Sequence, residues 1–213
     1  MVKVKKFVFN EFYENTYILY DSNSKVAAVI DPGCRVDSEK NELTFFIDRE
    51  KLQVKYLINT HCHLDHVFGN KYVKEKYTPL FYIPEKDLPL LLNAKKQGEA
   101  FGVSVEESPS PDGFIDNLEN LILGESELKF LYTPGHSPGE FSIYLKDEEI
   151  LIAGDVLFKE GIGRTDLWGG NYDTLIHSIK TKLLVLPENT LVYSGHGEET
   201  TIGYEKKYNP YLT

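Results

Sequence analysis

The stretch NTHCHLDH at residues 59–66 decides how this chain is interpreted, because it holds three of the six histidines. It directly follows a short apolar run that is predicted to be a strand. His61 and His63 are two residues apart and would point the same way if strand geometry continued, whereas Asp65 and His66 could turn toward a second position nearby. Imidazole nitrogen and carboxylate oxygen are ligands that a borderline metal such as zinc accepts. The stretch therefore predicts a metal site at a strand end.

Three further candidate ligands, His136, Asp155 and His196, stand in a similar setting. Each directly follows a predicted strand and has a glycine beside it, which lets the backbone turn sharply and approach a metal closely. A single histidine after a strand is more often a hydrogen-bonded turn residue than a ligand. Five of the six histidines lie after a predicted strand, however, and only His177 falls inside a predicted helix, where we interpret it as structural. The pattern predicts that four strand ends converge on one edge of a sandwich.

The composition is ordinary for a soluble globular protein. Of the 213 residues, 41% are apolar and 26% are charged, which is ordinary for such a protein. The net charge of −10 disfavours non-specific binding to nucleic acid or to an anionic membrane. No run approaches the ~18 apolar residues that a membrane helix needs. We therefore expect neither a nucleic-acid nor a membrane partner. The charge says little about the substrate, and the oligomeric state is open.

The cysteines and the N-terminus favour a cytoplasmic location. Two cysteines, Cys34 and Cys62, are too few for a disulfide framework, so a reducing compartment is the simpler interpretation. The first ten residues, MVKVKKFVFN, alternate like a strand. No long apolar stretch follows their lysines, so they do not form a signal peptide.

The hydrophobic pattern predicts roughly ten strands and five helices, with helices inserted between groups of strands. Strands are expected near residues 2–9, 16–20, 26–30, 54–59, 80–83, 121–123, 128–133, 141–145, 150–153 and 190–194. Helices are expected at residues 36–52, 68–77, 85–96, 172–183 and 201–207, with a surface loop at 97–116. Two sheets with helices outside would accommodate this order. We therefore predict an α+β protein, a four-layer αββα sandwich that forms one domain over residues 1–213.

These residues resemble the metallo-β-lactamase superfamily, whose signature is H-x-H-x-D-H followed by a distant His, Asp and His. Further matching pieces are PGHSPG at 134–139, GDVLF at 154–158, GIGRTD at 161–166 and SGHGEETTIGYE at 194–205. The match covers nearly the whole chain. Within the superfamily it is similar to the single-domain, type II glyoxalase-like (hydroxyacylglutathione hydrolase-like) hydrolases. The resemblance implies the metallo-β-lactamase fold, with the metal site at one edge of two sheets.

The family pattern implies two divalent metal ions, zinc being expected and iron or manganese being alternatives. The implied ligands are His61, His63 and His136 for the first metal, Asp65, His66 and His196 for the second, and Asp155 for both. A metal-bound hydroxide held near the catalytic residues Asp65 and Asp155 would attack the carbonyl of a small thioester, such as S-lactoylglutathione or a related acyl thiol.

One departure from the family pattern leaves an alternative open. Full-length glyoxalase II carries a C-terminal helical domain that contacts glutathione, whereas this chain ends 213 − 196 = 17 residues after His196. The GRTD piece and a cysteine between the first two histidines also occur in persulfide dioxygenases. In that family a single iron would be held here by His61, His136 and Asp155.

Three neighbouring residues have uncertain roles at this stage. Cys62 would project away from the metals if strand alternation holds. Arg164 could anchor an anionic end of the substrate or pair internally with Asp166, and we favour the internal pair. Asp31, in an Asp-Pro-Gly turn, could orient a ligand histidine or could serve only the turn.

Overall fold

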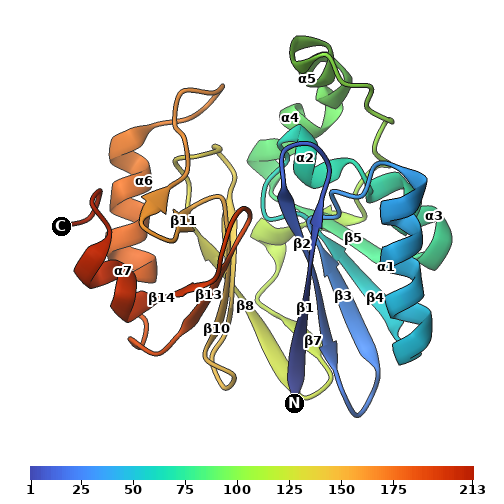
Figure 1. Cartoon of the computed structure of the whole chain (residues 1–213), viewed down its shortest axis with the longest axis horizontal. Helices are drawn as coiled ribbons and strands as arrows, with labels where there is room; N and C mark the ends of the chain where they lie inside the picture. Colours follow the sequence, from blue (N-terminus) through green and yellow to red (C-terminus); the bar gives the residue numbers. More distant parts are fainter. The chain divides into compact units, whose positions relative to one another are not determined.

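The computed structural model describes all residues, 1–213, and the chain divides into two compact units (Figure 1). The N-terminal unit comprises residues 1–118 and 122–126, and the C-terminal unit comprises residues 119–121 and 127–213. The chain has fourteen strands, of which β6, β11, β12 and β14 are two residues long. The ten longer strands occupy the ten places that the hydrophobic pattern predicts.

The sheet of the N-terminal unit has the strand order β1-β2-β3-β4-β5-β6. Its strands are β1 (Val2–Phe9), β2 (Glu14–Asp21), β3 (Val26–Ile30), β4 (Gln53–Ile58), β5 (Leu80–Ile83) and β6 (Gly113–Phe114). The first three strands are antiparallel neighbours, and β3 to β6 run parallel to one another. The ends of β3 and β4 and the start of β2 therefore lie at the same edge of this sheet.

Helices supply the crossovers that parallel strands require. Helix α1 (Asp37–Glu50) joins β3 to β4, and α2 (Leu64–Val67) and α3 (Asn70–Tyr77) join β4 to β5. Helix α1 begins where the Glu39 carboxylate accepts the backbone N–H of Val36 at 3.1 Å. It ends at Lys51, which adopts a left-handed conformation with φ 56°. Its buried face joins the core of the unit through Leu43, Phe46 and Ile47.

The region from residue 85 to residue 116 differs from the prediction of one helix followed by a loop. A 3-10 turn (Glu85–Asp87) leads into α4 (Leu88–Leu92), and α5 (Ala94–Phe101) follows after a break at Asn93. The Asn93 side chain donates to the carbonyl of Pro89 at 2.8 Å, which competes with the helical hydrogen bonds at this point. The predicted loop is therefore wrong for its first five residues, and it also contains β6.

The second sheet, formed mostly by residues of the C-terminal unit, has the strand order β14-β13-β10-β9-β8-β7. Its strands are β7 (Leu121–Leu123), β8 (Ser126–Tyr132), β9 (Phe141–Leu145), β10 (Ile150–Gly154), β13 (Leu191–Ser194) and β14 (Thr200–Thr201). The pairs β8–β9 and β9–β10 are antiparallel and β10–β13 is parallel, so β8, β10 and β13 end at the same edge. Beyond this edge, β11 (Leu157–Phe158) and β12 (Gly161–Ile162) form a small hairpin.

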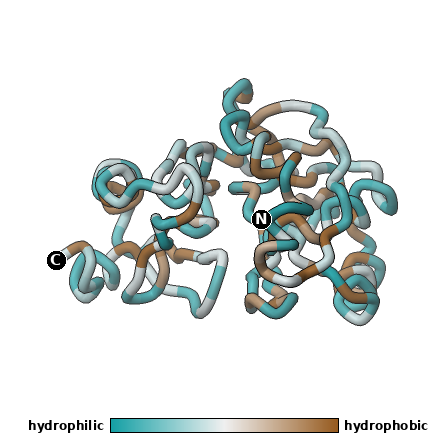
Figure 2. Tube along the Cα trace, turned by 90° about the horizontal axis from the view of Figure 1, so that it is seen from above, coloured by the Kyte–Doolittle hydropathy of each residue, from teal (hydrophilic) through white to brown (hydrophobic).

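Helix α6 (Tyr172–Ser178) continues into a wider π turn (Ile179–Leu183), and together they make the crossover between β10 and β13. Helix α7 (Ile202–Tyr208) follows β14. Leu175, Ile179 and Leu183 pack in the core of this unit with residues of β10 and β13. Figure 2 shows hydrophobic and hydrophilic segments alternating around the helices, as expected for helices that bury one face. None of the helices has the length and apolar character needed to span a membrane.

Candidate metal centre

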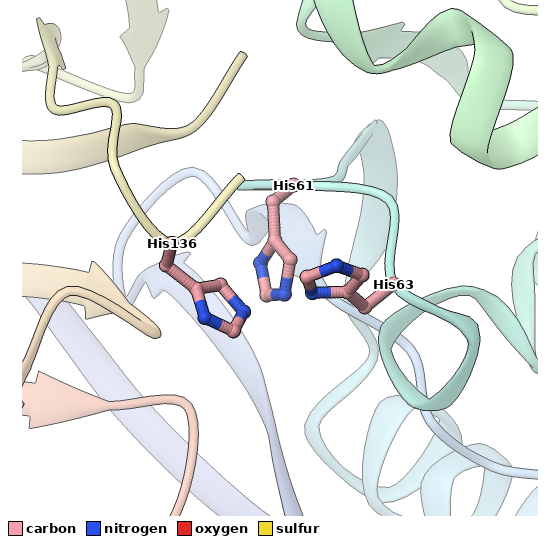
Figure 3. A group of neighbouring side chains, drawn as sticks. All are labelled: His61, His63 and His136. Carbon is pink, nitrogen blue, oxygen red and sulfur yellow. The ribbon is translucent and has the colours of Figure 1, made fainter. Parts of the chain in front are cut away.

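The first group of predicted ligands, which we call the N-terminal cluster, consists of His61, His63, Asp65 and His66. His61 and His63 follow β4 and are 0% and 6% exposed. In Figure 3 the ring of His63 turns toward that of His61, and their centroids are 4.9 Å apart. His66, within α2, is 0% exposed, and its ring centroid lies 4.1 Å from that of His61. The chain thus gathers three buried imidazoles where apolar side chains would otherwise be expected.

Two carboxylates flank the His66 ring. The Asp65 Oδ2 atom lies 3.7 Å from His66 Nε2, and the Asp31 Oδ2 atom lies 3.4 Å from His66 Nδ1. Ligand atoms of Asp31, His61 and His66 all fall within 4.8 Å of one another. Close imidazoles and carboxylates are the donor set that zinc and similar divalent metals accept. This cluster therefore fits a metal ion.

Asp31 forms part of the turn after β3 and also lies behind a candidate ligand histidine. It has a left-handed backbone conformation, with φ 48°, in the turn that follows β3. Its carboxylate accepts the backbone N–H of Thr60 at 2.7 Å and the Thr60 hydroxyl at 2.6 Å. Since that hydroxyl donates to Asp31, the Thr60 oxygen can accept from His61 Nδ1, 3.2 Å away. Asp31 thereby orients His66 directly and His61 through Thr60, which leaves each Nε2 available for a metal.

Cys62 points into the apolar core of the N-terminal unit and is 0% exposed. Its backbone N–H donates to the buried Asp87 carboxylate at 3.1 Å. Burial, with Asp87 nearby, raises the pKa of the Cys62 thiol well above its ordinary value. Both cysteines are free. A protonated thiol on the core side of the strand end agrees with the prediction that Cys62 projects away from the ligands.

The second group of predicted ligands, the C-terminal cluster, consists of His136, Asp155 and His196. These residues follow β8, β10 and β13, whose ends share one edge of the sheet. The Asp155 Oδ2 atom lies 3.5 Å from the Nε2 atoms of both His136 and His196. One carboxylate therefore faces two imidazoles that are 60 residues apart in the sequence.

Backbone groups fix the orientation of this cluster. His136, which is also labelled in Figure 3, has its Nδ1 atom 2.7 Å from the backbone carbonyl of Arg164. A carbonyl only accepts, so Nδ1 carries the proton and Nε2 is available as a ligand. The backbone at Gly163 passes so close to Asp155 that a Cβ atom at position 163 would lie 1.8 Å from the backbone oxygen of Asp155. Only glycine fits at this position. The backbone N–H of Asp155 donates to the buried Glu140 carboxylate at 2.7 Å.

The Arg164 side chain turns back on its own loop. Its Nε and Nη2 atoms donate to the two Asp166 carboxylate oxygens, each at 2.7 Å. This internal pair is the alternative that the sequence favours. His177 lies on the exposed side of α6, in agreement with a structural assignment.

The family model described as the metallo-β-lactamase superfamily matches residues 10–196, which include both clusters. The chain belongs to the metallo-β-lactamase superfamily. It is 40% identical to a Bacillus subtilis protein named probable metallo-hydrolase YqgX, over 93% of this chain and 92% of that protein. It is 38% identical to Haemophilus influenzae hydroxyacylglutathione hydrolase GloC, over 94% of this chain and 93% of that protein.

Solved structures show the same fold. The structure of BLEG-1 B3 metallo-β-lactamase matches with a TM-score of 0.90 and 36% identity, covering 99% of this chain and all of that one. The structure of TTHA1623 in a di-iron-bound form matches with a TM-score of 0.86 and 31% identity, covering 98% of this chain and all of that one. The prediction of an α+β protein with the metallo-β-lactamase fold is confirmed.

The superfamily signature does not point to two buried acidic residues, Glu14 and Glu140. Both are 0% exposed, and each contacts a cluster residue. In sequence, Glu14 opens a strand and Glu140 precedes one, which are ordinary positions for exposed carboxylates. Only the three-dimensional structure distinguishes them from surface residues.

Proposed function

We propose that the chain is a metal-dependent hydrolase of a small thioester, such as S-lactoylglutathione or a related acyl thiol, with two divalent metal ions. The observation that carries this proposal is the ligand set of the two clusters. Each consists only of imidazoles and carboxylates, and Asp155 faces two histidines at once. The family match runs through both clusters, which supports their acting together as one domain over residues 1–213.

Seven residues would hold the metals. We assign His61, His63 and His136 to the first metal, Asp65, His66 and His196 to the second, and Asp155 to both. We propose zinc because it suits mixed nitrogen and oxygen ligands, with iron or manganese as alternatives. When bound, such metals supply an activated water at neutral pH and stabilise an oxyanion that forms on the substrate.

The residues of the chain itself prepare this chemistry. The carboxylates of Asp65 and Asp155 would accept a proton from the attacking water and orient it toward the substrate carbonyl. The Arg164 carbonyl keeps the proton of His136 on Nδ1, and Asp31 Oδ2, 3.4 Å from His66 Nδ1, favours the same tautomer of His66, so that the Nε2 atoms would serve as ligands. No side-chain nucleophile is needed, in accord with the buried, protonated Cys62.

A thioester substrate is supported by one relative in particular. GloC is named a hydroxyacylglutathione hydrolase, and this chain covers 93% of its length. A relative of similar length to this chain is therefore named for thioester hydrolysis. A cytoplasmic location remains part of the proposal and is supported by the two buried free thiols.

A persulfide dioxygenase with a single iron is the second candidate. The structure of TTHA1623, at 31% identity, supports iron as the metal, although it is a di-iron-bound form and the second candidate needs one iron. In this alternative His61, His136 and Asp155 would suffice, and His63 would not be a ligand.

The decisive test combines metal analysis with two assays on natively purified protein. We expect about two metal ions per chain and hydrolysis of S-lactoylglutathione or another small acyl thiol. We expect His63→Ala to lower this activity by ~100-fold or more while the protein remains folded, since it removes a metal ligand. His177→Ala, which replaces an exposed histidine of α6, is the matched control and should keep full activity. One iron per chain, with oxygen uptake on a persulfide, would replace this proposal with the second candidate.

A further inference from the structure

Glu14 is a fully buried carboxyl group that the proposed reaction does not use. It opens β2 and is 0% exposed. Its Oε2 atom accepts the Thr16 hydroxyl at 2.8 Å, and its Oε1 atom lies 3.9 Å from His66 Nδ1. The same Nδ1 atom lies 3.4 Å from Asp31 Oδ2. Two carboxyl groups from different strands thus face one imidazole nitrogen.

The sheet topology places these two groups together. Strands β2 and β3 are antiparallel, with Tyr17 opposite Ile30, so the start of β2 meets the end of β3. Thr16 tightens this junction, because its hydroxyl oxygen accepts the backbone N–H of Gly33 at 2.8 Å. A Cβ atom at Gly33 would lie 2.0 Å from Glu14 Oε2. The turn after β3 therefore closes directly over the Glu14 carboxyl group.

Burial of this carboxyl group is unfavourable by itself. Desolvation raises the pKa of Glu14 well above its ordinary value, although the nearby His66 lowers it. An apolar side chain of similar size would cost less free energy at a fully buried position. Asp31 already accepts two hydrogen bonds from Thr60, so it shares Oδ2 between Thr60 and His66. Glu14 Oε1, 3.9 Å away, places a second carboxyl group beside the same His66 Nδ1 atom.

We propose that Glu14 is a positioning residue that acts with Asp31 to hold His66 with its Nε2 atom directed to the second metal. This inference rests on the proposed function, because it assigns His66 to that metal. A carboxylate behind a ligand imidazole fixes the ring and makes it a stronger ligand. Loss of Glu14 should therefore weaken the second metal position selectively.

The test is a titration of metal-free protein with Zn²⁺ in competition with a chromophoric chelator. Glu14→Gln keeps the size and an acceptor oxygen but replaces the carboxyl group with an amide. We expect it to weaken the second zinc equivalent by roughly 10- to 100-fold and to leave the first unchanged. Glu14→Asp, which keeps the carboxylate, should recover part of the affinity.

Asp21→Asn is the matched control. Asp21 ends the same strand, is 2% exposed, and pairs with the N-terminal amino group at 2.8 Å, far along β2 from His66. We expect Asp21→Asn to lower the melting temperature and to leave both zinc affinities unchanged. Glu14→Gln binding both equivalents as tightly as wild type, or losing both together as its melting temperature falls, would overturn the inference.

A second measurement needs no variant. In ¹⁵N NMR of metal-free wild type, His66 should carry its proton on Nδ1, and a proton on Nε2 instead would overturn the inference. Wild-type protein that binds only one zinc would instead contradict the proposed function, so the two failures are distinguishable.

Discussion

The two clusters use the same ligand chemistry but are held in different ways. The N-terminal cluster lies within six consecutive residues, and side-chain carboxylates orient its histidines. The C-terminal cluster is spread over 61 residues, from 136 to 196, and its supports are mixed: a backbone carbonyl orients His136, and the Glu140 carboxylate holds the backbone of Asp155. Its most exposed member is the His196 side chain, at 27%, against 13% for the Asp65 side chain, which is the most exposed of the N-terminal cluster.

Because its residues are contiguous, the N-terminal cluster can be recognised from one stretch of sequence. The C-terminal cluster is recognised only from the similar setting of three separate residues. A side-chain support such as Asp31 can be removed by mutation, whereas the Arg164 carbonyl remains whatever side chain stands there. The N-terminal cluster should therefore be sensitive to substitutions behind its ligands. The C-terminal cluster should be sensitive to changes in its ligands, its glycines and Glu140, and insensitive to the side chain at position 164.

The largest effect is expected at Asp155, because its single carboxylate faces both His136 and His196. Asp155→Asn should lower hydrolase activity by at least ~100-fold and reduce the metal content measured by elemental analysis. Asp166→Asn removes an exposed carboxylate from the same unit and should keep wild-type metal content. Full activity in Asp155→Asn would refute the assignment of the C-terminal cluster.

The contrast between the clusters is tested most sharply by Asp31→Asn and Arg164→Ala. Asp31→Asn should weaken zinc binding roughly 10- to 100-fold, because the amide cannot replace the carboxylate toward both Thr60 and His66. Arg164→Ala should stay within about twofold of wild type, since the exposed ion pair contributes little and the backbone carbonyl remains. Chelator competition measures both. Equal losses in the two variants would contradict the proposed contrast.

Gly163→Ala should damage the C-terminal cluster by steric overlap, because its Cβ atom would lie 1.8 Å from the Asp155 backbone oxygen. We expect a loss of about 1–3 kcal/mol in the free energy of unfolding, measured with urea. Gly161→Ala, in the adjacent hairpin, is the control, since its Cβ atom would meet nothing nearer than 3.5 Å. If the two variants are equally stable, the close approach at Gly163 is not required.

The smallest effect is expected at Cys62. Cys62→Ala should cost about 1 kcal/mol of stability for a small buried side chain and should leave the number of bound metals unchanged. Elemental analysis together with urea unfolding checks both points. Loss of a metal ion in this variant would show that the thiol is a ligand.

Much of the fold could be predicted because its elements have strong local patterns. Helix α1 has one apolar face with an acidic first turn, and β2 and β3 are apolar runs separated by turn residues. The break at Asn93 could not be predicted, because it depends on one side-chain hydrogen bond to Pro89. Two-residue strands such as β11 and β12 have too few residues to give a periodic signal.

The histidines of the candidate site could be predicted from the sequence, whereas its buried glutamates could not. Histidines are rare in this chain, so their placement after strands carries information that survives without the structure. Glutamates are common, so neither Glu14 nor Glu140 differs in sequence from a surface residue. The burial of Glu14 follows from the strand order and from the turn that closes at Gly33, and Glu140 contacts the backbone of Asp155, 15 residues later in the chain.

The central claim is that the seven cluster residues bind two metal ions. A crystal structure of the zinc-loaded protein, with anomalous maps at the zinc edge, tests it most directly. We predict two peaks, one ligated by His61, His63 and His136, one by Asp65, His66 and His196, and Asp155 between them. A single peak, or peaks ligated by other residues, would contradict the claim.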